Sequence, residues 1–491
     1  DALFKVFHPN QVRWSMLRNG IVLSLCTCSA ALQAQGNDPM LLVDDEGFEI
    51  RGHLQGGVNA VAETNLFWNL SDTFAPEENF DPDTQWLEFY FKPGMSFTAQ
   101  NETIAVYGKV SGVASYTEGT DAFDFTDQGD VTLEEAYLGV STKTSGGFGI
   151  DVSVGARELR LGTGMLIANG GSSGFELGAL KFGPRKAWDM SAIAKLSKGG
   201  TTFTGFFLNP NERPVIENEN RLFGADIRHD FETGGFVGAS FIAVTKSGTP
   251  YVQAAPGGVG APTVLDGARD NTNTANFYAR TGQLSGALEN WLFAIDGAYQ
   301  WNNDLDLSAW AGRVQVGYTF ANLGWKPSIT YSYQTFSGDD PDTPELERFD
   351  PLFYEGSPTA WVTGSKSSSV FINSNVAAHG VALQGRPSPK DTLTLRYAHI
   401  RANELRSPLQ FGQASRVDLG PGGDAPANIV AGVTDAHVSD DLFIEYSRII
   451  TRNLFLTVGL SISEPGEGIE RTVPGGVPAW TGGFVNVVFN F

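Results

Sequence analysis

Charged side chains alternate with apolar ones in several short segments of this sequence. In 308–320 the apolar residues have one parity, whereas Arg313 and Gln315 have the other. Arginine binds carboxylate and phosphate groups through paired hydrogen bonds, so such residues can line a binding path for an anion. The same alternation selects a larger set of candidates: Arg157, Arg228, Arg280, Arg313, Arg396, Asp151, Asp226, Asp296 and Gln315. The arginines could bind an anionic solute, or they could pair with the aspartates and stiffen the structure.

Spacing among the histidines gives no support for an enzyme. The six are His8, His53, His229, His379, His399 and His437. They include no His-Glu-x-x-His pair, and the chain has no Gly-x-x-x-x-Gly-Lys phosphate loop. We therefore predict no catalytic activity and no cofactor.

One acidic segment has residues that could bind a hard cation. Asp339, Asp340, Asp342 and Asp350 offer the oxygen ligands that Ca²⁺ prefers. Their spacing differs from that of an EF-hand loop, so an ordinary acidic loop is the simpler interpretation. Phe349 belongs to the same loop motif.

The chain is strongly acidic, with a formal net charge of −22. This charge excludes non-specific binding of nucleic acid. Much of the acid falls in 62–84 and 117–130, neither of which contains Lys or Arg. These stretches are either solvated loops or functional sites. As functional sites they would bind divalent cations that bridge to lipopolysaccharide, or create an electrostatic field that screens solutes at the mouth.

The elements that would position these residues are short strands with period-two alternation. We predict them at 48–61, 85–99, 103–116, 131–142, 148–160, 187–197, 200–208, 220–231, 235–246, 275–286, 289–301, 308–320, 325–336, 375–386, 391–402, 438–449, 453–462 and 478–491. Transmembrane barrel strands alternate in this way, with apolar residues toward lipid and polar residues toward the lumen. A charge facing lipid at mid-membrane costs about 2–4 kcal/mol, which favours the inward assignment of the charged candidates.

Short and long connections alternate along the whole chain. The long ones include 161–186, 247–274, 337–374 and 403–437. This pattern predicts an all-β fold: a transmembrane antiparallel up-and-down β-barrel of about eighteen strands, with short periplasmic turns and long extracellular loops. Such a barrel is too wide for side chains to fill, so an aqueous lumen is expected. The predicted location is the outer membrane of a Gram-negative bacterium.

Aromatic residues lie near the predicted strand ends, as the interfacial girdles of a membrane barrel require. They are Trp86, Trp188, Trp291, Trp301, Trp310, Tyr318, Phe320, Trp325, Tyr331, Tyr333, Tyr397, Tyr446 and Trp480. Ordinary strand propensity would also place aromatic residues there. The last predicted strand ends on Phe491, a terminal signal that outer-membrane assembly machinery could read.

The first 34 residues are expected to comprise residues upstream of the true start of the protein, followed by a secretory signal peptide that is cleaved. Both cysteines, Cys26 and Cys28, lie there, so the mature chain is expected to have no thiol chemistry. Residues 35–491 would then form one barrel domain.

Two stretches resemble the alginate-export family of outer-membrane barrels. One is Gly155-Ala156-Arg157-Glu158-Leu159-Arg160-Leu161-Gly162 followed by Met165-Leu166-Ile167; the other is Ser337-Gly338-Asp339-Asp340-Pro341 followed by Arg348-Phe349-Asp350-Pro351-Leu352-Phe353, with Leu393-Thr394-Leu395-Arg396-Tyr397 after it. The resemblance implies a monomeric channel with a basic lumen that passes an anionic polysaccharide.

Three functions are compatible with these observations. The first is passive transport of anionic saccharides or related hydrophilic solutes, with lipid and lipopolysaccharide as the surroundings. The second is a general or small-organic-acid uptake porin. The third is a surface adhesive or structural barrel whose loops 337–374 and 403–437 bind a partner.

Overall fold

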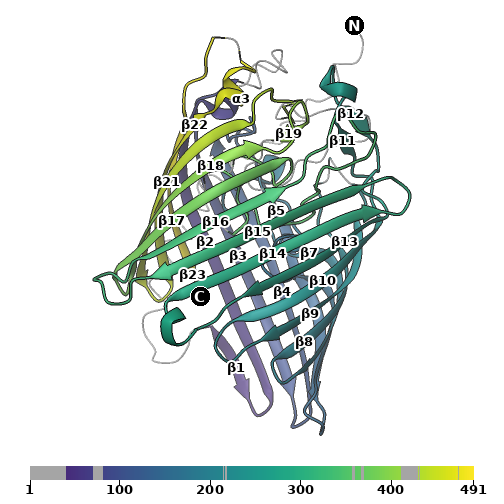
Figure 1. Cartoon of the computed structure of the whole chain (residues 1–491). Coiled ribbons are helices and arrows are strands. Elements are labelled where there is room, and N and C mark those ends of the chain that lie inside the picture. Colours follow the sequence, from purple (N-terminus) through teal and green to yellow (C-terminus); the bar gives the residue numbers. More distant parts are fainter. Residues whose placement is uncertain are drawn as a thin grey trace.

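In the computed structural model, strands that alternate apolar and polar residues form a closed barrel (Figure 1). The structure describes residues 40–69, 81–213, 215, 218–356, 360–365, 370–410, 429–430, 432–473 and 475–491. The predicted signal peptide and the cysteines lie outside these residues. Among the described residues, no helix is long and apolar enough to span a membrane.

In the described part of the chain, eighteen antiparallel strands form the barrel wall. They are β2 (Phe48–Thr64), β3 (Thr84–Gln100), β4 (Ile104–Gly119), β5 (Gly129–Lys143), β6 (Gly149–Arg157), β7 (Trp188–Lys198), β8 (Thr201–Asn209), β9 (Arg221–Asp230), β10 (Phe236–Lys246), β13 (Thr272–Arg280), β14 (Trp291–Asn302), β15 (Ser308–Thr319), β16 (Ser328–Phe336), β17 (Val376–Ser388), β18 (Asp391–Ala402), β21 (His437–Thr451), β22 (Leu454–Pro465) and β23 (Trp480–Asn490). Each pairs with its neighbour in sequence, and β23 pairs with β2 to close the ring. The predicted fold and strand number are confirmed.

Strand positions agree with the predicted segments to within a few residues except at β13. This strand ends at Arg280, whereas the sequence predicted 275–286. After Arg280 the backbone packs closely against the preceding turn at Gly282, where a Cβ would lie 2.2 Å from the carbonyl oxygen of Thr233. The chain then forms a short 3₁₀ turn, η5 (Gly286–Leu288), before β14 begins.

The smaller elements gather at the two ends of the barrel (Figure 1). At one end, β1 (Leu41–Asp45) forms a hairpin with β2. The loop end holds η1 (Leu66–Asn69), η3 (Phe175–Leu177), β11 (Tyr251–Gln253), η4 (Pro256–Gly258), β12 (Thr263–Leu265), β19 (Leu409–Gln410), β20 (Ile429–Val430) and α3 (Glu467–Glu470). The sequence pattern did not predict these elements, because each is too short to have a period of its own.

Strand parity separates an apolar outer face from a polar inner face, as predicted. Trp310, Val314 and Val316 are exposed on the outside of β15, while Arg313 between them is buried. Trp325 is also exposed. The girdle prediction is wrong for Trp86, Trp188 and Trp480, which are buried at the loop end.

One irregularity in β5 breaks the alternation and turns two successive acids inward. Ser111 lies opposite Glu135 and Gly112 lies opposite Leu133, so Glu134 is an extra residue in the strand. A β-bulge of this kind re-aims a side chain. Glu134 accepts a hydrogen bond from Lys92 at 3.0 Å, and Glu135 accepts one from Ser111 at 3.0 Å. Period-two reasoning assigned neither acid to the interior.

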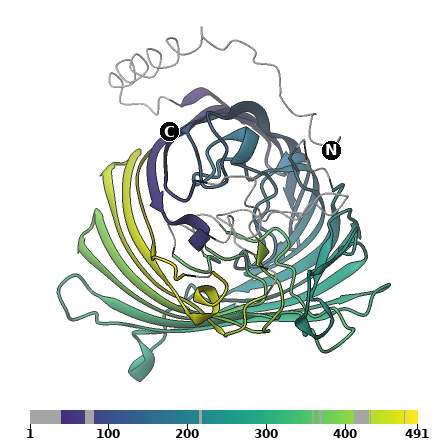
Figure 2. The ribbon, with the colours of Figure 1, turned by 90° about the horizontal axis from the view of Figure 1, so that it is seen from above.

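Two long connections, as far as the structure describes them, fold into the barrel instead of extending from it (Figure 2). We call 158–187 and the described residues of 337–375 (337–356, 360–365 and 370–375) the two inner segments. Phe353 donates its backbone N–H to Leu166 at 2.9 Å, and Ala168 donates to Phe353 at 2.8 Å. Buried apolar side chains join them in one core: Met165, Leu166, Ile167, Phe349, Leu352 and Trp361. The two stretches that resemble the alginate-export family therefore pack against each other inside the barrel.

The first inner segment is also attached to the wall. Glu88 of β3 accepts the backbone N–H groups of Lys181 at 2.8 Å and Phe182 at 3.0 Å. Lys181 forms an ion pair with Glu63 of β2. Glu63 is almost completely buried, so the sequence interpretation of 62–84 as solvated acid is wrong for this residue. Asp72, Glu77 and Glu78 of the same stretch lie outside the described residues.

Candidate functional site

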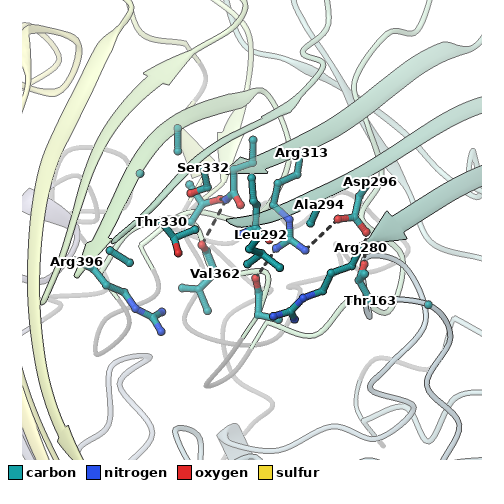
Figure 3. Close-up of a pocket in the computed structure, with 18 of the residues that line it drawn as sticks. Thr163, Arg280, Leu292, Ala294, Asp296, Arg313, Thr330, Ser332, Val362 and Arg396 are labelled. Atoms are coloured by element: carbon teal, nitrogen blue, oxygen red, sulfur yellow. Dashed lines mark hydrogen bonds and ion pairs between the residues drawn. The ribbon is translucent and has the colours of Figure 1, made fainter. Parts of the chain in front are cut away.

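A cavity of about 1060 Å³ lies inside the barrel, between the wall and the two inner segments (Figure 3). Its lining includes seven residues that strand parity selected: Arg228, Arg280, Arg313, Arg396, Asp226, Asp296 and Gln315. Strand parity identifies these residues because every second residue of a wall strand points into the lumen. Arg157 and Asp151 also have the inward parity of β6, but they do not line this cavity.

Arg313 connects the wall to the second inner segment. Its guanidinium donates to Asp296 at 3.1 Å and to the carbonyl oxygen of Ala360 at 2.9 Å. The same group lies 3.5 Å from the ring centroid of Trp361. Thr163 of the first inner segment donates to Asp296. For Arg313, the alternative of pairing with an aspartate is therefore correct, and its role includes positioning the inner segments.

Three other cations of the cavity have no ion-pair or hydrogen-bond partner among the described residues. They are Lys195 of β7, Arg280 of β13 and Arg396 of β18. Arg280 and Arg396 are exposed to the lumen and reach toward its middle from two sides (Figure 3). An unpaired guanidinium in a water-filled lumen can hydrogen-bond a passing carboxylate without first breaking a contact of its own.

Lys195 was missed by the sequence reasoning. Its neighbours Ala194 and Leu196 are exposed on the outer face of β7, which turns Lys195 inward. The parity argument that found Arg396 would have found it. Arg160, in the first inner segment, also lines the cavity and pairs with Glu355 at 2.7 Å.

Charge in the cavity has the opposite sign from that of the whole chain. Among the residues that the structure describes, six bases line it: Arg160, Lys195, Arg228, Arg280, Arg313 and Arg396. Four acids of the described chain line it: Asp226, Asp230, Asp296 and Asp441. The described lining therefore has a formal excess of two positive charges, although the chain has a net charge of −22.

Some of these charged groups already have an ion-pair or hydrogen-bond partner in the protein. Arg228 donates to both carboxylate oxygens of Asp230, at 2.9 Å and 3.1 Å. Asp226 accepts hydrogen bonds from Ser240 at 2.7 Å and from the Tyr278 hydroxyl at 2.8 Å. The unpaired positive charge is thus concentrated at Lys195, Arg280 and Arg396.

Arg157 and Asp151 form a separate network in the wall. The Tyr107 hydroxyl donates to Asp151 at 2.7 Å and accepts from Arg157 at 3.1 Å. The Arg157 guanidinium also lies 4.6 Å from the ring centroid of Tyr137. These contacts support a structural role for the pair.

Two acids of the loop motif, Asp339 and Asp350, are held by hydrogen bonds to other parts of the protein. Asp339 accepts hydrogen bonds from the Tyr251 hydroxyl at 2.8 Å and from the backbone N–H of Ala254 at 2.7 Å. Burial raises the pKa of Tyr251 well above its ordinary value, so its hydroxyl stays protonated as a donor. Asp350 accepts from Arg269 at 2.7 Å.

The predicted Ca²⁺ ligands do not come together as a set. Among the residues that the structure describes, Asp339, Asp340, Asp342 and Asp350 do not bring three ligand atoms within reach of one ion. Phe349 is fully buried beside Phe336, at a ring-centroid distance of 5.8 Å. The interpretation as an ordinary acidic loop is favoured, with the motif fixing the second inner segment.

A closed barrel with an apolar outer face and a charged lumen defines an outer-membrane channel. The family to which this chain belongs is the alginate export family, whose sequence profile matches residues 100–475. No curated protein sequence matches the chain.

Solved structures similar to this chain are porin-like barrels. OccAB1 of Acinetobacter baumannii has a TM-score of 0.50 and 8% sequence identity, and the alignment covers 90% of this chain and 97% of that one. OccK5 (OpdH) of Pseudomonas aeruginosa has a TM-score of 0.49 and 9% identity, with coverage of 90% and 98%. At these identities the likeness shows the fold alone.

Proposed function

We propose that this outer-membrane channel passes anionic saccharides or related hydrophilic solutes by passive diffusion. The observation that carries the proposal is the excess of positive charge around the lumen cavity, with Lys195, Arg280 and Arg396 lacking ion-pair partners among the described residues. The carboxylates of a solute would pass from one such cation to the next as the solute crosses the lumen. Membership of the alginate export family is consistent with this substrate class.

Single-channel conductance of the refolded mature protein in a planar bilayer tests the proposal. Anion selectivity in reversal potentials, with block of the current by added polyuronate, is the expected result. Cation selectivity without block would contradict it.

A small-organic-acid uptake porin is the second candidate. The two inner segments share a buried core and narrow the lumen, which favours small solutes over a polymer. Block by small organic acids, with no block by polyuronate, would favour this candidate. The adhesive-barrel hypothesis has less support, because the described part of 337–374 packs inside the barrel.

We further infer that the protein is a monomer surrounded by lipid and lipopolysaccharide. We also infer that the outer-membrane assembly machinery recognises Phe491. Phe491 exchanges backbone hydrogen bonds with Leu54 of β2, at 2.8 Å and 3.1 Å, so the end of the chain lies where the barrel closes. Size-exclusion chromatography with light scattering tests the monomer.

A further inference from the structure

Two histidines and an aspartate converge at the loop end of the barrel, away from the lumen cavity. His399 is near the end of β18, and His437 and Asp440 are at the start of β21. His399 Nδ1 lies 2.8 Å from Asp440 Oδ1, and His437 Nε2 lies 2.9 Å from Asp440 Oδ2. One candidate ligand atom from each residue lies within 4.8 Å of the other two.

We propose that His399, His437 and Asp440 form a binding site for a divalent transition-metal ion of the Zn²⁺ or Cu²⁺ class. Imidazole nitrogen with one carboxylate suits these ions, whereas Ca²⁺ and Mg²⁺ prefer oxygen ligands alone. Ligands bound to Zn²⁺ at about 2.0–2.2 Å in a tetrahedron lie roughly 3.3 Å apart, so small side-chain shifts complete the site.

The strand register brings the three residues to one place. His399 lies opposite Asp440, and Arg401 lies opposite His437 after a register shift between Ile400 and Arg401. Exposed Tyr397 and Leu442 form the opposed pair two residues away, so His399 and Asp440 share their outward face. The side chains of the three proposed ligands are between 30% and 34% exposed, which leaves access for an ion.

The surroundings favour a cation. Tyr397 donates its hydroxyl to Asp440 Oδ1 at 2.6 Å, as an outer-shell group that orients a ligand carboxylate. Glu464 of β22 lies opposite Asp440 and adds a second carboxylate to this face. The imidazole rings of His399 and His437 are stacked, with centroids 4.8 Å apart, so both present a nitrogen to the same carboxylate.

A hydrogen-bonded cluster without an ion is the alternative. In that case each histidine must carry a proton on the nitrogen that faces Asp440. A bound ion would replace both protons and join β18 to β21 across the long connection between them.

Titration of the full mature protein in detergent with Zn²⁺, without an affinity tag and after chelator treatment, tests the site. Isothermal titration calorimetry should show one equivalent bound. His399→Ala and His437→Ala should each weaken Zn²⁺ binding by more than about 100-fold, and Tyr397→Phe by about tenfold. His229→Ala is the matched control, because His229 bonds Thr201 at the other end of the barrel, and it should bind as the wild type does.

Electron paramagnetic resonance of the wild-type protein with one equivalent of Cu²⁺ needs no variant. Hyperfine coupling to two nitrogen nuclei is the expected result. A Zn²⁺ titration without a stoichiometric site, binding that survives both histidine substitutions, or a Cu²⁺ spectrum without nitrogen coupling would each overturn the proposal.

Discussion

The guanidinium of Arg313 lies 3.5 Å from the ring centroid of Trp361, so a wall strand and an inner segment meet face to face. Arg313 comes from β15 and Trp361 from 337–375. Trp361 is fully buried and donates its indole N–H to the carbonyl oxygen of Thr163 at 3.0 Å. This one side chain therefore contacts both the wall and the first inner segment.

Trp361→Ala should loosen the contact of the inner segments with β15. Loss of a buried Trp costs about 3–5 kcal/mol of local stability, and the emptied volume would widen the path. We expect larger and noisier single-channel conductance. Trp310→Ala is the control, because Trp310 lies half-exposed on the outer face of β15. Equal conductance in both variants and the wild type would show that the inner segments do not restrict the path.

Arg280→Ala and Arg396→Ala should each reduce anion selectivity. The interaction energy between two unit charges 4 Å apart is about 1 kcal/mol in water. Loss of one lumen charge should therefore lower the anion/cation permeability ratio by up to about fivefold. Reversal potentials across a salt gradient measure this ratio.

Arg448→Ala is the matched control for both lumen substitutions. Arg448 pairs with Asp391 at 3.0 Å, and both have the outward parity of their strands. An equal change in this control would mean that the effect does not come from the lumen. Screening by salt should shrink the difference for Arg280 and Arg396 at high ionic strength.

Asp121 should make the protein more stable at acidic pH. Its carboxyl is buried in the connection between β4 and β5, so the sequence interpretation of 117–130 as solvated acid is wrong here. Burial raises the pKa of Asp121 from its ordinary value of 3.8 to about 7, although the backbone N–H groups of Phe123 and Phe125 oppose this shift.

The direction of this pH dependence follows from the number of protons that the folded and unfolded states bind. Between pH 4 and 7 the folded state holds a proton that the unfolded state has released, so the free energy of unfolding falls as pH rises. The effect is on the order of 1–4 kcal/mol. Asp121→Asn should flatten the pH dependence of the melting temperature in this window, whereas Asp127→Asn, at an exposed position, should keep it. An unchanged slope in Asp121→Asn would refute the raised pKa.

Asp350→Ala should destabilise the second inner segment. It would leave the guanidinium of Arg269 buried with its main ion pair removed, which typically costs about 3–5 kcal/mol. Limited proteolysis and thermal melting measure the loss. Asp342→Ala, at an exposed residue of the same motif, should stay within about 0.5 kcal/mol of the wild type. A rise in melting temperature on adding Ca²⁺, lost in both variants, would instead restore the calcium hypothesis.

The sequence by itself determined the barrel wall. Alternation is a local property with a period of two, so 308–320 alone shows that Val314 faces out and Arg313 faces in. The switch between short and long connections then sets the strand number. The same local signal points Lys195 inward, because its neighbours Ala194 and Leu196 face out. It fails at Glu134, because a bulge adds a residue that no alternation reveals.

The tertiary structure decided what the inward charges do. Arg313 and Arg396 have the same parity signal, yet Arg313 is bound by Asp296 and Trp361, while Arg396 has no such partner among the described residues. His399 and Asp440 became neighbours through strand register, although their sequence spacing predicts no metal site. Pairing between strands and packing of long connections depend on residues far apart in the chain, and no local period records them.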